Sequence, residues 1–483
     1  MGYINNHIVD TMKKRIFLLY PPVSKEERYG SALGASGGNQ IPLGIYYLSS
    51  ALRNAGFTIK AYDAEIAGNN AEATAEMIRD FLPDAMGISC TTVAYHRAVE
   101  VARIVKKNLP QLPIVIGGPH VTSNYTHAMS FSCFDYGVVG EGEETAIELF
   151  HSIFSNNPLL SSIKGIVFRK DGELLFTGHR ALIDNLDTIA FPAYDLIKNI
   201  SQYNPPPSNY KKLPVVNIIT SRGCPNHCTF CDRAVFGNKL RQRSAENVVE
   251  EISLLVKKYN VKEIAFVDDT FTIGKNRLIK IFNLLEKRKI RITWTCMSRV
   301  NTVDRELLHF LKQHGCWHIS FGIESGSQKI LNMIKKGITL EMAEKAVKEC
   351  ASTGIRTKGF FMIGHPGETM DTINDTISFA LKIPLDTMIA TINTPHPGTE
   401  QYSDALKFGT VDETDWSKWS NLRPVFVPHG LSEKILLKKH QELYRRFYLR
   451  PRIIFFTILS FFSISGIRRF SALLRSSLYM FKN

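Results

Sequence analysis

Short apolar runs alternate with amphipathic stretches through most of the 483-residue chain. Between residues 14 and 155, five runs have the length of buried strands, and stretches of helical spacing separate them. This alternation predicts a doubly wound parallel sheet with helices on both faces. The expected strands are Ile16–Tyr20, Thr58–Tyr62, Ala85–Ser89, Ile114–Gly117 and Tyr136–Val139, and the expected helices are Ile45–Ala55, Ala71–Phe81, Ala94–Lys107 and Glu143–Phe154.

The alternation resumes at Leu213 and yields six more strand candidates. Six consecutive βα units predict a partial parallel barrel, whose open side could admit a large substrate. The strands are expected at Val215–Thr220, Glu263–Val267, Ile292–Met297, His318–Phe321, Thr357–Ile363 and Thr387–Ile392. Ser244 is expected to cap a helix over Ala245–Tyr259.

The chain therefore divides into an α/β sheet domain at 14–155, a connector at 156–212, a barrel at 213–395 and a helical C-terminal region at 396–483. The connector contains a predicted hairpin at 165–176 with an Asp-Gly turn. A stiff, proline-rich linker follows at 204–209. Trp416 and Trp419 in the C-terminal region are expected to pack rather than to contact a substrate.

Three cysteines follow the first predicted barrel strand at the spacing C-x3-C-x2-C, namely Cys224, Cys228 and Cys231. Four-iron clusters normally take one cysteine per iron, so three thiolates would leave one iron open for a small molecule. Structural zinc is the alternative, and it needs a fourth ligand to close its tetrahedron. His227 is directly beside Cys228 in the chain, which is poor geometry for that ligand.

Polar or glycine-rich residues follow many of the predicted strands. Ligands of parallel α/β folds bind beyond the carboxyl ends of the strands, so these residues form the candidate site. In the barrel they are Asp268, Asp269, Arg299, Glu324, Ser325 and Gly364, on the rim that carries the cysteines. In the sheet domain they are Ser89, Thr91, Gly117, Gly118, Gly140 and Gly142. Paired glycines let a backbone approach a bulky ligand, although tight turns explain most such pairs.

The net charge of +14 is concentrated near the end of the chain, where eleven Lys and Arg face two Glu from Glu433 onward. This distribution does not favour a nucleic-acid partner. The apolar run Ile453–Ile467 has 15 residues, whereas a spanning helix needs about 17–25. With its flanking arginines, the run suits a helix on an anionic membrane surface or, equally, a helix docked on the barrel. No signal peptide is visible, so a reducing cytoplasmic location is expected, with peripheral contact to the inner membrane face.

The cysteine spacing, with Phe230 directly before the last cysteine, resembles the radical S-adenosylmethionine (SAM) superfamily. The resemblance implies that the three cysteines ligate a [4Fe–4S] cluster whose open iron is chelated by SAM. It further implies that Phe230 lies against the adenosyl group and that Asp268 and Asp269 stand where the SAM amino group binds. Arg299 would pair with the SAM carboxylate, Glu324 and Ser325 resemble the ribose-contacting stretch, and the segment around Gly364 resembles the adenine-contacting stretch.

Residues 42–48, 117–122 and 140–143 resemble the cobalamin-binding domain that is fused to one large class of these enzymes. That class includes members like the anaerobic magnesium-protoporphyrin ester cyclases and the hopanoid-modifying enzymes. The resemblance implies cobalamin as a third cofactor, bound by Ser89, Thr91 and the four glycines. Many such domains supply a histidine to cobalt from the loop after the first strand, but Pro21–Asn39 contains none. The dimethylbenzimidazole tail is therefore expected inside the sheet, with His96 or His120 as weaker substitutes for the missing ligand.

The resemblance implies methylation of an unactivated carbon, in which a 5′-deoxyadenosyl radical abstracts hydrogen and methylcobalamin donates the methyl group. The basic apolar tail suggests an apolar or lipid-like substrate, and a flavodoxin or ferredoxin is the expected reductant. The alternative within the class is a radical oxidative cyclase or rearrangement enzyme acting on a tetrapyrrole or isoprenoid. A redox-sensing module is less favoured, because simple electron-transfer clusters are fully ligated by cysteine. A nucleic-acid modifying protein is less favoured as well, because the basic tail has an apolar core.

Overall fold

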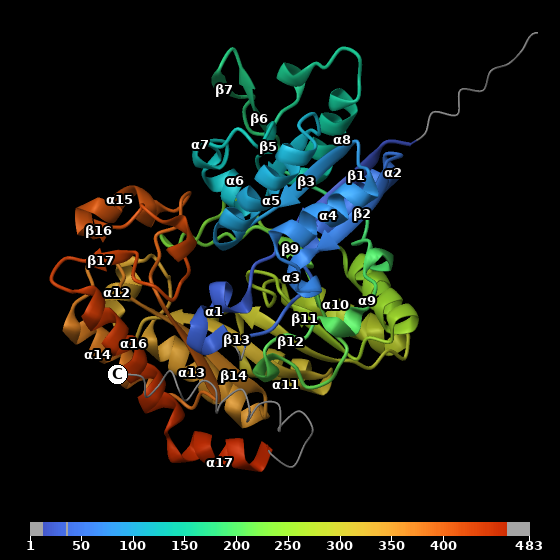
Figure 1. Cartoon of the computed structure of the whole chain (residues 1–483). Helices are drawn as coiled ribbons and strands as arrows, with labels where there is room; N and C mark the ends of the chain where they lie inside the picture. The colour runs from blue at the N-terminus through green and yellow to red at the C-terminus, as the bar shows by residue number, and fades with distance from the viewer. Residues whose placement is uncertain (1–12, 35–36, 461–483) are drawn as a thin grey trace, which may run out of the picture.

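A seven-stranded sheet forms the N-terminal part of the computed structural model, which describes residues 13–34 and 37–460 (Figure 1). The strand order is β2-β1-β3-β4-β5-β6-β7. β1 to β5 are parallel, and β6 and β7 are antiparallel to their neighbours. The strands are β1 (Arg15–Tyr20), β2 (Thr58–Asp63), β3 (Ala85–Ser89), β4 (Ile114–Gly117), β5 (Tyr136–Val138), β6 (Ile166–Lys170) and β7 (Glu173–Phe176). The five strands expected at 14–155 are therefore confirmed.

Helices cover both faces of this sheet. α4 (Ala71–Phe81) and α5 (Tyr95–Asn108) pack on one face, and α2 (Leu43–Asn54) and α8 (Gly142–Ile153) pack on the other. Alternate residues of β1 belong to the two clusters, since Phe17 contributes to the first and Leu18 to the second. Shorter helices lie in the loops, namely α1 (Lys25–Gly34), α3 (Ala64–Ala67), α6 (Pro119–Ser123) and α7 (Tyr125–Ala128).

The predicted hairpin of the connector is present as β6 and β7. Its turn residues Asp171 and Gly172 have φ of 52° and 88°, the left-handed values that a tight hairpin turn requires. The hairpin pairs with β5 and so extends the N-terminal sheet. The strand–helix alternation did not indicate this, because antiparallel addition to a sheet edge leaves no crossover helix in the sequence.

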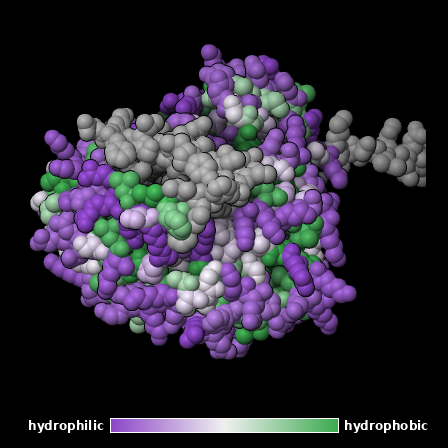
Figure 2. Space-filling view, turned by 90° about the horizontal axis from the view of Figure 1, so that it is seen from below, coloured by the Kyte–Doolittle hydropathy of each residue, from purple (hydrophilic) through white to green (hydrophobic). Residues whose placement is uncertain are grey.

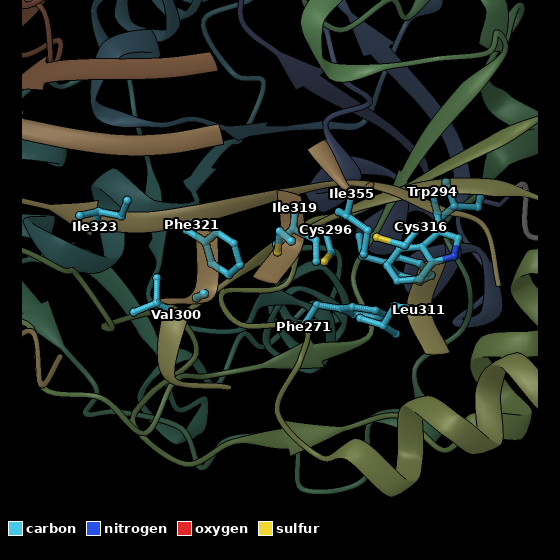
Figure 3. Packing of buried hydrophobic residues seen from close by; sticks show 14 of the residues in the cluster. Phe271, Trp294, Cys296, Val300, Leu311, Cys316, Ile319, Phe321, Ile323 and Ile355 are labelled. Carbon is cyan, nitrogen blue, oxygen red and sulfur yellow. The ribbon is translucent and has the colours of Figure 1, made fainter. Parts of the chain in front are cut away.

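Six parallel strands form the second half, in the order β15-β14-β13-β12-β11-β8. All six predicted barrel strands are present, as β8 (Val215–Ile218), β11 (Glu263–Phe266), β12 (Thr293–Ser298), β13 (Cys316–Glu324), β14 (Arg356–Ile363) and β15 (Thr387–Ile392). The helices between them are α9 (Ala245–Tyr259), α10 (Lys275–Lys287), α11 (Arg305–Gln313), α12 (Gln328–Met333), α13 (Leu340–Thr353) and α14 (Met370–Lys382). Ser244 caps α9 as expected, because its Oγ accepts from the Asn247 N–H. Aromatic, aliphatic and cysteine side chains from several strands fill the core (Figure 3).

The barrel is open, because its outer strands β8 and β15 do not pair with each other. On β8, the Asn217 amide accepts from the Ile41 N–H and donates to the Ile41 carbonyl, as a neighbouring strand would. On β15, Met388 and Ala390 bond through backbone N–H and C=O to the Tyr448 and Tyr444 hydroxyls of α16 (Glu433–Tyr448). Backbone groups on the β15 edge thus have hydrogen-bond partners, and on β8 the Asn217 side chain joins the strand to the segment before α2.

The described part of the C-terminal region, residues 396–460, contains helices, loops and one short antiparallel pair, β16 (Gly409–Val411) and β17 (Phe426–Pro428), which the sequence did not predict. Its remaining described helices are α15 (Glu400–Phe408) and α17 (Pro451–Ser460). Trp419 is buried and stacks on Trp416, which in turn stacks on His127, so the predicted packing role is confirmed. The predicted apolar run Ile453–Ile467 begins in α17, and its part beyond Ser460 lies outside the described residues.

Candidate cofactor sites and the cavity between them

The three cysteines lie in a loop whose ends are joined by a short antiparallel pair, β9 (Ser221–Arg222) and β10 (Arg241–Gln242). Gly223 begins the loop with φ of 82°, and a Cβ there would lie 2.3 Å from the Lys239 carbonyl oxygen. Only glycine fits such a position without moving backbone. The loop is therefore closed tightly at its base, directly before Cys224.

Hydrogen-bond donors contact two of the three thiols. The Asn226 amide lies 3.2 Å from Cys224 Sγ, and Arg299 Nη1 lies 3.5 Å from Cys228 Sγ. Burial and, next, the Asp269 carboxylate together raise the pKa of Cys231 to about 12, so this thiol holds its proton until a metal displaces it.

The arrangement of the three cysteine side chains does not suit a single metal ion. Within residues 13–34 and 37–460, no group of three His, Cys, Asp or Glu side chains converges as a single ion would require. A four-iron cluster needs no such convergence, because each cysteine binds a different iron. The loop therefore fits a cluster with one thiolate for each of three irons.

Charged residues pack around the cysteine loop at the rim of the barrel. Glu324 at the end of β13 has φ of 71°, an uncommon value for a residue other than glycine. Its carboxylate accepts from Lys336 Nζ at 2.8 Å, and this ammonium lies 5.6 Å from the centre of the Phe230 ring. Arg299 donates to the Lys336 carbonyl. The structure thus brings together Phe230, Arg299 and Glu324 beside Cys228, as the sequence predicts, and adds Lys336.

The two predicted carboxylates after β11 have different surroundings. Asp268 is buried, and its Oδ1 accepts from the Thr220 N–H, the Thr220 hydroxyl and the Ser221 hydroxyl. Burial raises the pKa of the Asp268 carboxyl. Asp269 is exposed at its surface, but the protein around its carboxyl excludes part of the water. This desolvation, and next the charge of Asp268, raise the pKa of Asp269. Asp268 therefore ties β11 to the start of the cysteine loop, and Asp269 is the carboxylate available to a ligand.

Ser325 and Gly364 contribute to the rim through contacts within the protein. Ser325 is buried and bonds the Thr376 hydroxyl of α14. The Gly364 and His365 N–H groups donate to Glu368 Oε2. Burial lowers the pKa of His365 to about 3 and raises that of Glu368 to about 8, so both side chains are neutral in this structure at pH 7.

Several buried polar atoms on this rim have no hydrogen-bond partner among the described residues. They are both ring nitrogens of His365, Oε1 of Glu368, both amide atoms of Asn393, Oδ2 of Asp268 and Nε of Arg299. An unpaired buried polar group is costly, so a cluster of them indicates a ligand with its own donors and acceptors. SAM carries such groups on its adenine, ribose and methionyl parts, and the rim fits it.

A cavity of 640 Å³ lies between the N-terminal sheet and the cysteine loop. The six residues predicted in the sheet domain all line it, namely Ser89, Thr91, Gly117, Gly118, Gly140 and Gly142. Arg222, Asp232 and Asp269 line it from the barrel, and Asp232 directly follows Cys231. The two sets of strand ends therefore face one cavity.

The inner part of this cavity is an apolar recess in the sheet domain. Leu18, Leu52, Val138, Ala146 and Phe150 line it, and all five also belong to the cluster under α2 and α8. The recess fits the predicted place of the dimethylbenzimidazole tail, and the described lining contains no histidine.

The two histidines considered as substitute cobalt ligands have other partners. His96 Nε2 pairs with Glu27 Oε1 at 2.8 Å, and His120 Nε2 lies 3.0 Å from His127 Nδ1. Neither lines the cavity. Both histidines are thus engaged by other side chains of the sheet domain.

The fold and this arrangement define a class of protein. Residues 31–150 match the B12 binding domain family, and residues 218–380 match the radical SAM superfamily. The chain is 37% identical over 445 residues to an uncharacterized methyltransferase of Pyrococcus horikoshii, covering 91% of this chain and 94% of the relative. The chain therefore belongs to the cobalamin-binding radical SAM enzymes. Its cofactors are a [4Fe–4S] cluster, SAM and cobalamin.

Other relatives fix its place more closely. An anaerobic magnesium-protoporphyrin IX monomethyl ester cyclase of Rubrivivax gelatinosus is 27% identical over 91% of this chain and 78% of its own length. The radical SAM methyltransferase TsrM of Kitasatospora setae, solved with cobalamin and a [4Fe–4S] cluster, has the same fold, with a TM-score of 0.71, 16% identity and coverage of 97% and 99%. The chain is an enzyme of the cobalamin-dependent radical SAM methyltransferase family, to which cyclases are also related.

Four residues of this region were not predicted from the sequence, although signals for them were present. Glu141 and Glu143 alternate with two predicted glycines, and Arg222 precedes Gly223 and Cys224. Arg241 pairs with Arg222 across β9 and β10. Nothing in the sequence indicates that these residues meet, because the contacts join segments about 80 to 100 positions apart.

Proposed function

We propose that the enzyme methylates an unactivated carbon of an apolar, lipid-like small molecule. The observation that carries this proposal is the single cavity onto which both the cobalamin-side residues and the neighbours of the cluster loop open. Most of its exposed lining is apolar side chain and glycine backbone, with charged and polar groups from both domains, among them Glu65, Glu143 and Arg222. Such a lining favours a substrate that is held mainly by shape and apolar contact.

In this proposal different residues would bind the three cofactors. Cys224, Cys228 and Cys231 would hold three irons, and Asp269, Arg299 and Glu324, with Phe230, would orient SAM at the fourth. Ser89, Thr91 and the glycines Gly117, Gly118, Gly140 and Gly142 would cradle the cobalamin ring. When bound, the cluster and SAM supply radical chemistry and cobalamin supplies a transferable methyl group. The closed cysteine loop and the apolar recess would keep water away from these reactions.

The test is anaerobic turnover of the reconstituted holoenzyme with SAM that carries a deuterated methyl group. Apolar lipid and isoprenoid fractions serve as substrates, and mass spectrometry follows the products. We expect 5′-deoxyadenosine, S-adenosylhomocysteine and a product that gains one labelled methyl group. Formation of 5′-deoxyadenosine with no labelled methyl in any organic product would overturn methylation.

The second candidate function is oxidative cyclisation or rearrangement of a tetrapyrrole or isoprenoid. It is favoured by the cyclase of Rubrivivax gelatinosus, whose name states that it acts on magnesium-protoporphyrin IX monomethyl ester. The same experiment separates the two functions when tetrapyrrole esters are included. A cyclase would give a product with an added ring and no labelled methyl group.

The proposed reductant is a flavodoxin or ferredoxin, small acidic proteins that deliver single electrons. The cysteine loop contains the half-buried Arg233, which lines the cavity and donates to the Asn226 carbonyl, with its guanidinium 3.2 Å from His227 Nδ1. An acidic partner would be attracted to this side of the loop. Arg233→Gln should slow cluster reduction by flavodoxin more than reduction by dithionite, as followed by stopped-flow absorbance on protein whose iron content matches the wild type.

We propose further that α17 touches an anionic membrane surface on the cytoplasmic side. Ile454 and Phe455 are 42% and 59% exposed, and Arg446 and Arg452 lie nearby in the chain. α17 lies at the end of the molecule remote from the N-terminal sheet (Figure 1), and Figure 2 shows hydrophobic patches among hydrophilic residues on the face seen from that end. Among the described residues no helix is long and apolar enough to cross a membrane.

Vesicle sedimentation tests the membrane contact. The full chain should sediment with phosphatidylglycerol vesicles and not with phosphatidylcholine vesicles, because the basic residues need anionic lipid. Ile454→Asp with Phe455→Asp should weaken sedimentation, and Leu82→Asp, on an exposed leucine of the N-terminal domain, is the matched control. Equal sedimentation of the double variant and the wild type would discard α17 as the contact.

A further inference from the structure

Four buried charged residues join the cobalamin-binding domain to the base of the cysteine loop. We call Glu141, Glu143, Arg222 and Arg241 the interdomain clamp. Arg222 donates to Glu141 Oε1 at 2.7 Å and to Glu143 Oε1 at 2.5 Å. Arg241 donates to Glu141 Oε1 and Oε2 at 3.0 and 2.9 Å. Two carboxylates thus face two guanidinium groups, and the clamp is electrically neutral.

The clamp is buried, and Glu141, Glu143 and Arg222 also line the cavity between the two halves. All four residues are at most 9% exposed, and the Arg222 guanidinium lies over the rings of Tyr47 and Phe236 at 5.5 and 5.1 Å. Glu141 Oε2 also accepts from the Ile183 N–H, and Arg241 donates to the Ile183 carbonyl. In such surroundings an ion pair is screened little, and its geometry is narrowly defined.

The clamp joins the loop that holds the cysteines to the loop after β5. Its arginines are opposite each other in β9 and β10, the pair that closes the cysteine loop. Its carboxylates alternate with Gly140 and Gly142, which line the cavity on the cobalamin side. A second contact, from the Ser123 hydroxyl of α6 to Asp232 beside Cys231, joins the same two parts. The loop that carries the cluster ligands and the loop that contacts cobalamin are therefore fastened to each other.

We propose that the interdomain clamp sets the distance and orientation between cobalamin and the cluster, which makes Glu141 and Glu143 positioning residues of the reaction. Neither residue needs to touch a reacting atom. The clamp can serve this purpose whether the enzyme methylates or cyclises its substrate, because both reactions use the cofactors of the family.

Removing one carboxylate leaves a guanidinium buried without its partner. Such a charge draws in water or moves toward solvent, and either response shifts the two halves against each other. Small displacements of reacting groups are costly, since a misplacement of about 1 Å can slow a reaction by about 100-fold. Loss of the clamp should therefore change the geometry between the cofactors while each cofactor still binds.

The experiment compares Glu141→Gln and Glu143→Gln in the full-length, anaerobically reconstituted holoenzyme. The control is Glu251→Gln, which removes a buried carboxylate from Arg243 of the barrel and touches no residue of the clamp. Cobalamin and iron contents are measured first. Pulsed electron paramagnetic resonance then measures how strongly the reduced cluster speeds the relaxation of cob(II)alamin, which depends on the separation of the two centres.

We expect all three variants to keep both cofactors and to melt below the wild type. The relaxation enhancement should be changed in Glu141→Gln, changed less in Glu143→Gln because Glu141 still holds both arginines, and unchanged in Glu251→Gln. If Glu141→Gln does not fold, Glu143→Gln carries the test. Wild-type enhancement in the folded clamp variants would overturn the proposal and leave the clamp a purely stabilising contact.

Discussion

The thiols of Cys224, Cys228 and Cys231 have surroundings that suit a metal cluster. Replacing any one of them by alanine should abolish stable cluster binding, because residues 224–231 contain no fourth cysteine to supply a substitute thiolate. Iron and sulfide analysis and the visible absorption of the anaerobically reconstituted protein check this. Cys133→Ala, a buried cysteine of the N-terminal domain, is the control and should keep wild-type iron content.

Glu368 gives the stability of the cofactor-free protein a pH dependence. Burial raises the pKa of its carboxyl from 4.5 to about 8. Between these values the folded protein keeps a proton that the unfolded chain has lost, so stability falls as pH rises, by about 1.4 kcal/mol per pH unit from this group. Its contribution is complete below pH 4.5 and lost near pH 8.

Glu368→Gln replaces the ionisable carboxyl with an amide and should flatten the dependence of stability on pH. The variant should gain stability relative to the wild type as the pH rises from 5 toward 8, measured by anaerobic denaturant unfolding. Glu72→Gln on the exposed side of α4 should keep the wild-type profile. Parallel profiles for wild type and Glu368→Gln would show that the carboxyl ionises normally in the folded protein.

The sequence predicted the positions of those site residues that lie at or near the end of a strand. Phe230, Arg299 and Asp269 lie where the strand ends implied, because parallel strands bring their carboxyl ends to one edge. Asp268 and Ser325 occupy the expected rim, but the structure engages them in bonds to Thr220 and Thr376. Sequence spacing cannot distinguish a carboxylate that faces a ligand from one that faces its neighbour.

The turn between β4 and α6 has a backbone that favours glycine. Gly118 has φ of 99°, and a Cβ there would lie 2.7 Å from the Cys90 carbonyl oxygen. Gly118→Ala should destabilise the protein by more than the about 1–2 kcal/mol of left-handed backbone strain, and it should weaken cobalamin binding by pushing this turn into the cavity.

Gly68→Ala is the matched control for this turn. Gly68 has φ of 69° with nothing within 4 Å of an added Cβ, so alanine there has the backbone strain without the steric clash. Thermal melting and spectrophotometric cobalamin titration of the two variants separate the effects. Equal cobalamin affinity of the two would show that the turn does not bear on the cofactor.

Most elements followed from hydrophobic periodicity, since all eleven expected parallel strands are present. The missed strands are short and antiparallel. β9 and β10 contain two residues each, and β16 and β17 contain three. Such strands are set by tertiary contacts, and alternation over two or three residues carries no signal.

At the scale of the whole molecule, the shared cavity couples the two domains through their ligand. Cobalamin added to the cofactor-free protein should slow amide hydrogen exchange in the turns after β3 and β4 and also in the barrel loop around Asp232 and Phe236, which line the same cavity. Global stability should rise by about 2.7 kcal/mol at a hundredfold excess over the dissociation constant. Mass-detected exchange checks this, with α13, remote from the cavity lining, as the internal control.

Protection confined to the N-terminal sheet would instead show that cobalamin contacts one domain only. The sequence predicted the two domains from their separate alternation patterns, but not how they meet. The interdomain clamp depends on side chains that only a folded partner surface brings into contact, so composition and periodicity contain no trace of it.

The open barrel also bears on how the protein avoids self-association. An incomplete barrel has two outer strands, and an unpaired strand edge is a template on which a second chain can add by backbone hydrogen bonds. Here the Asn217 amide bonds to Ile41 beside β8, and the Tyr444 and Tyr448 hydroxyls serve β15. The two tyrosine hydroxyls occupy backbone groups of β15 that an incoming strand would need, and the Asn217 side chain holds the segment at Ile41 beside β8. The barrel can therefore stay open toward its cofactors without offering the β15 edge to an incoming strand.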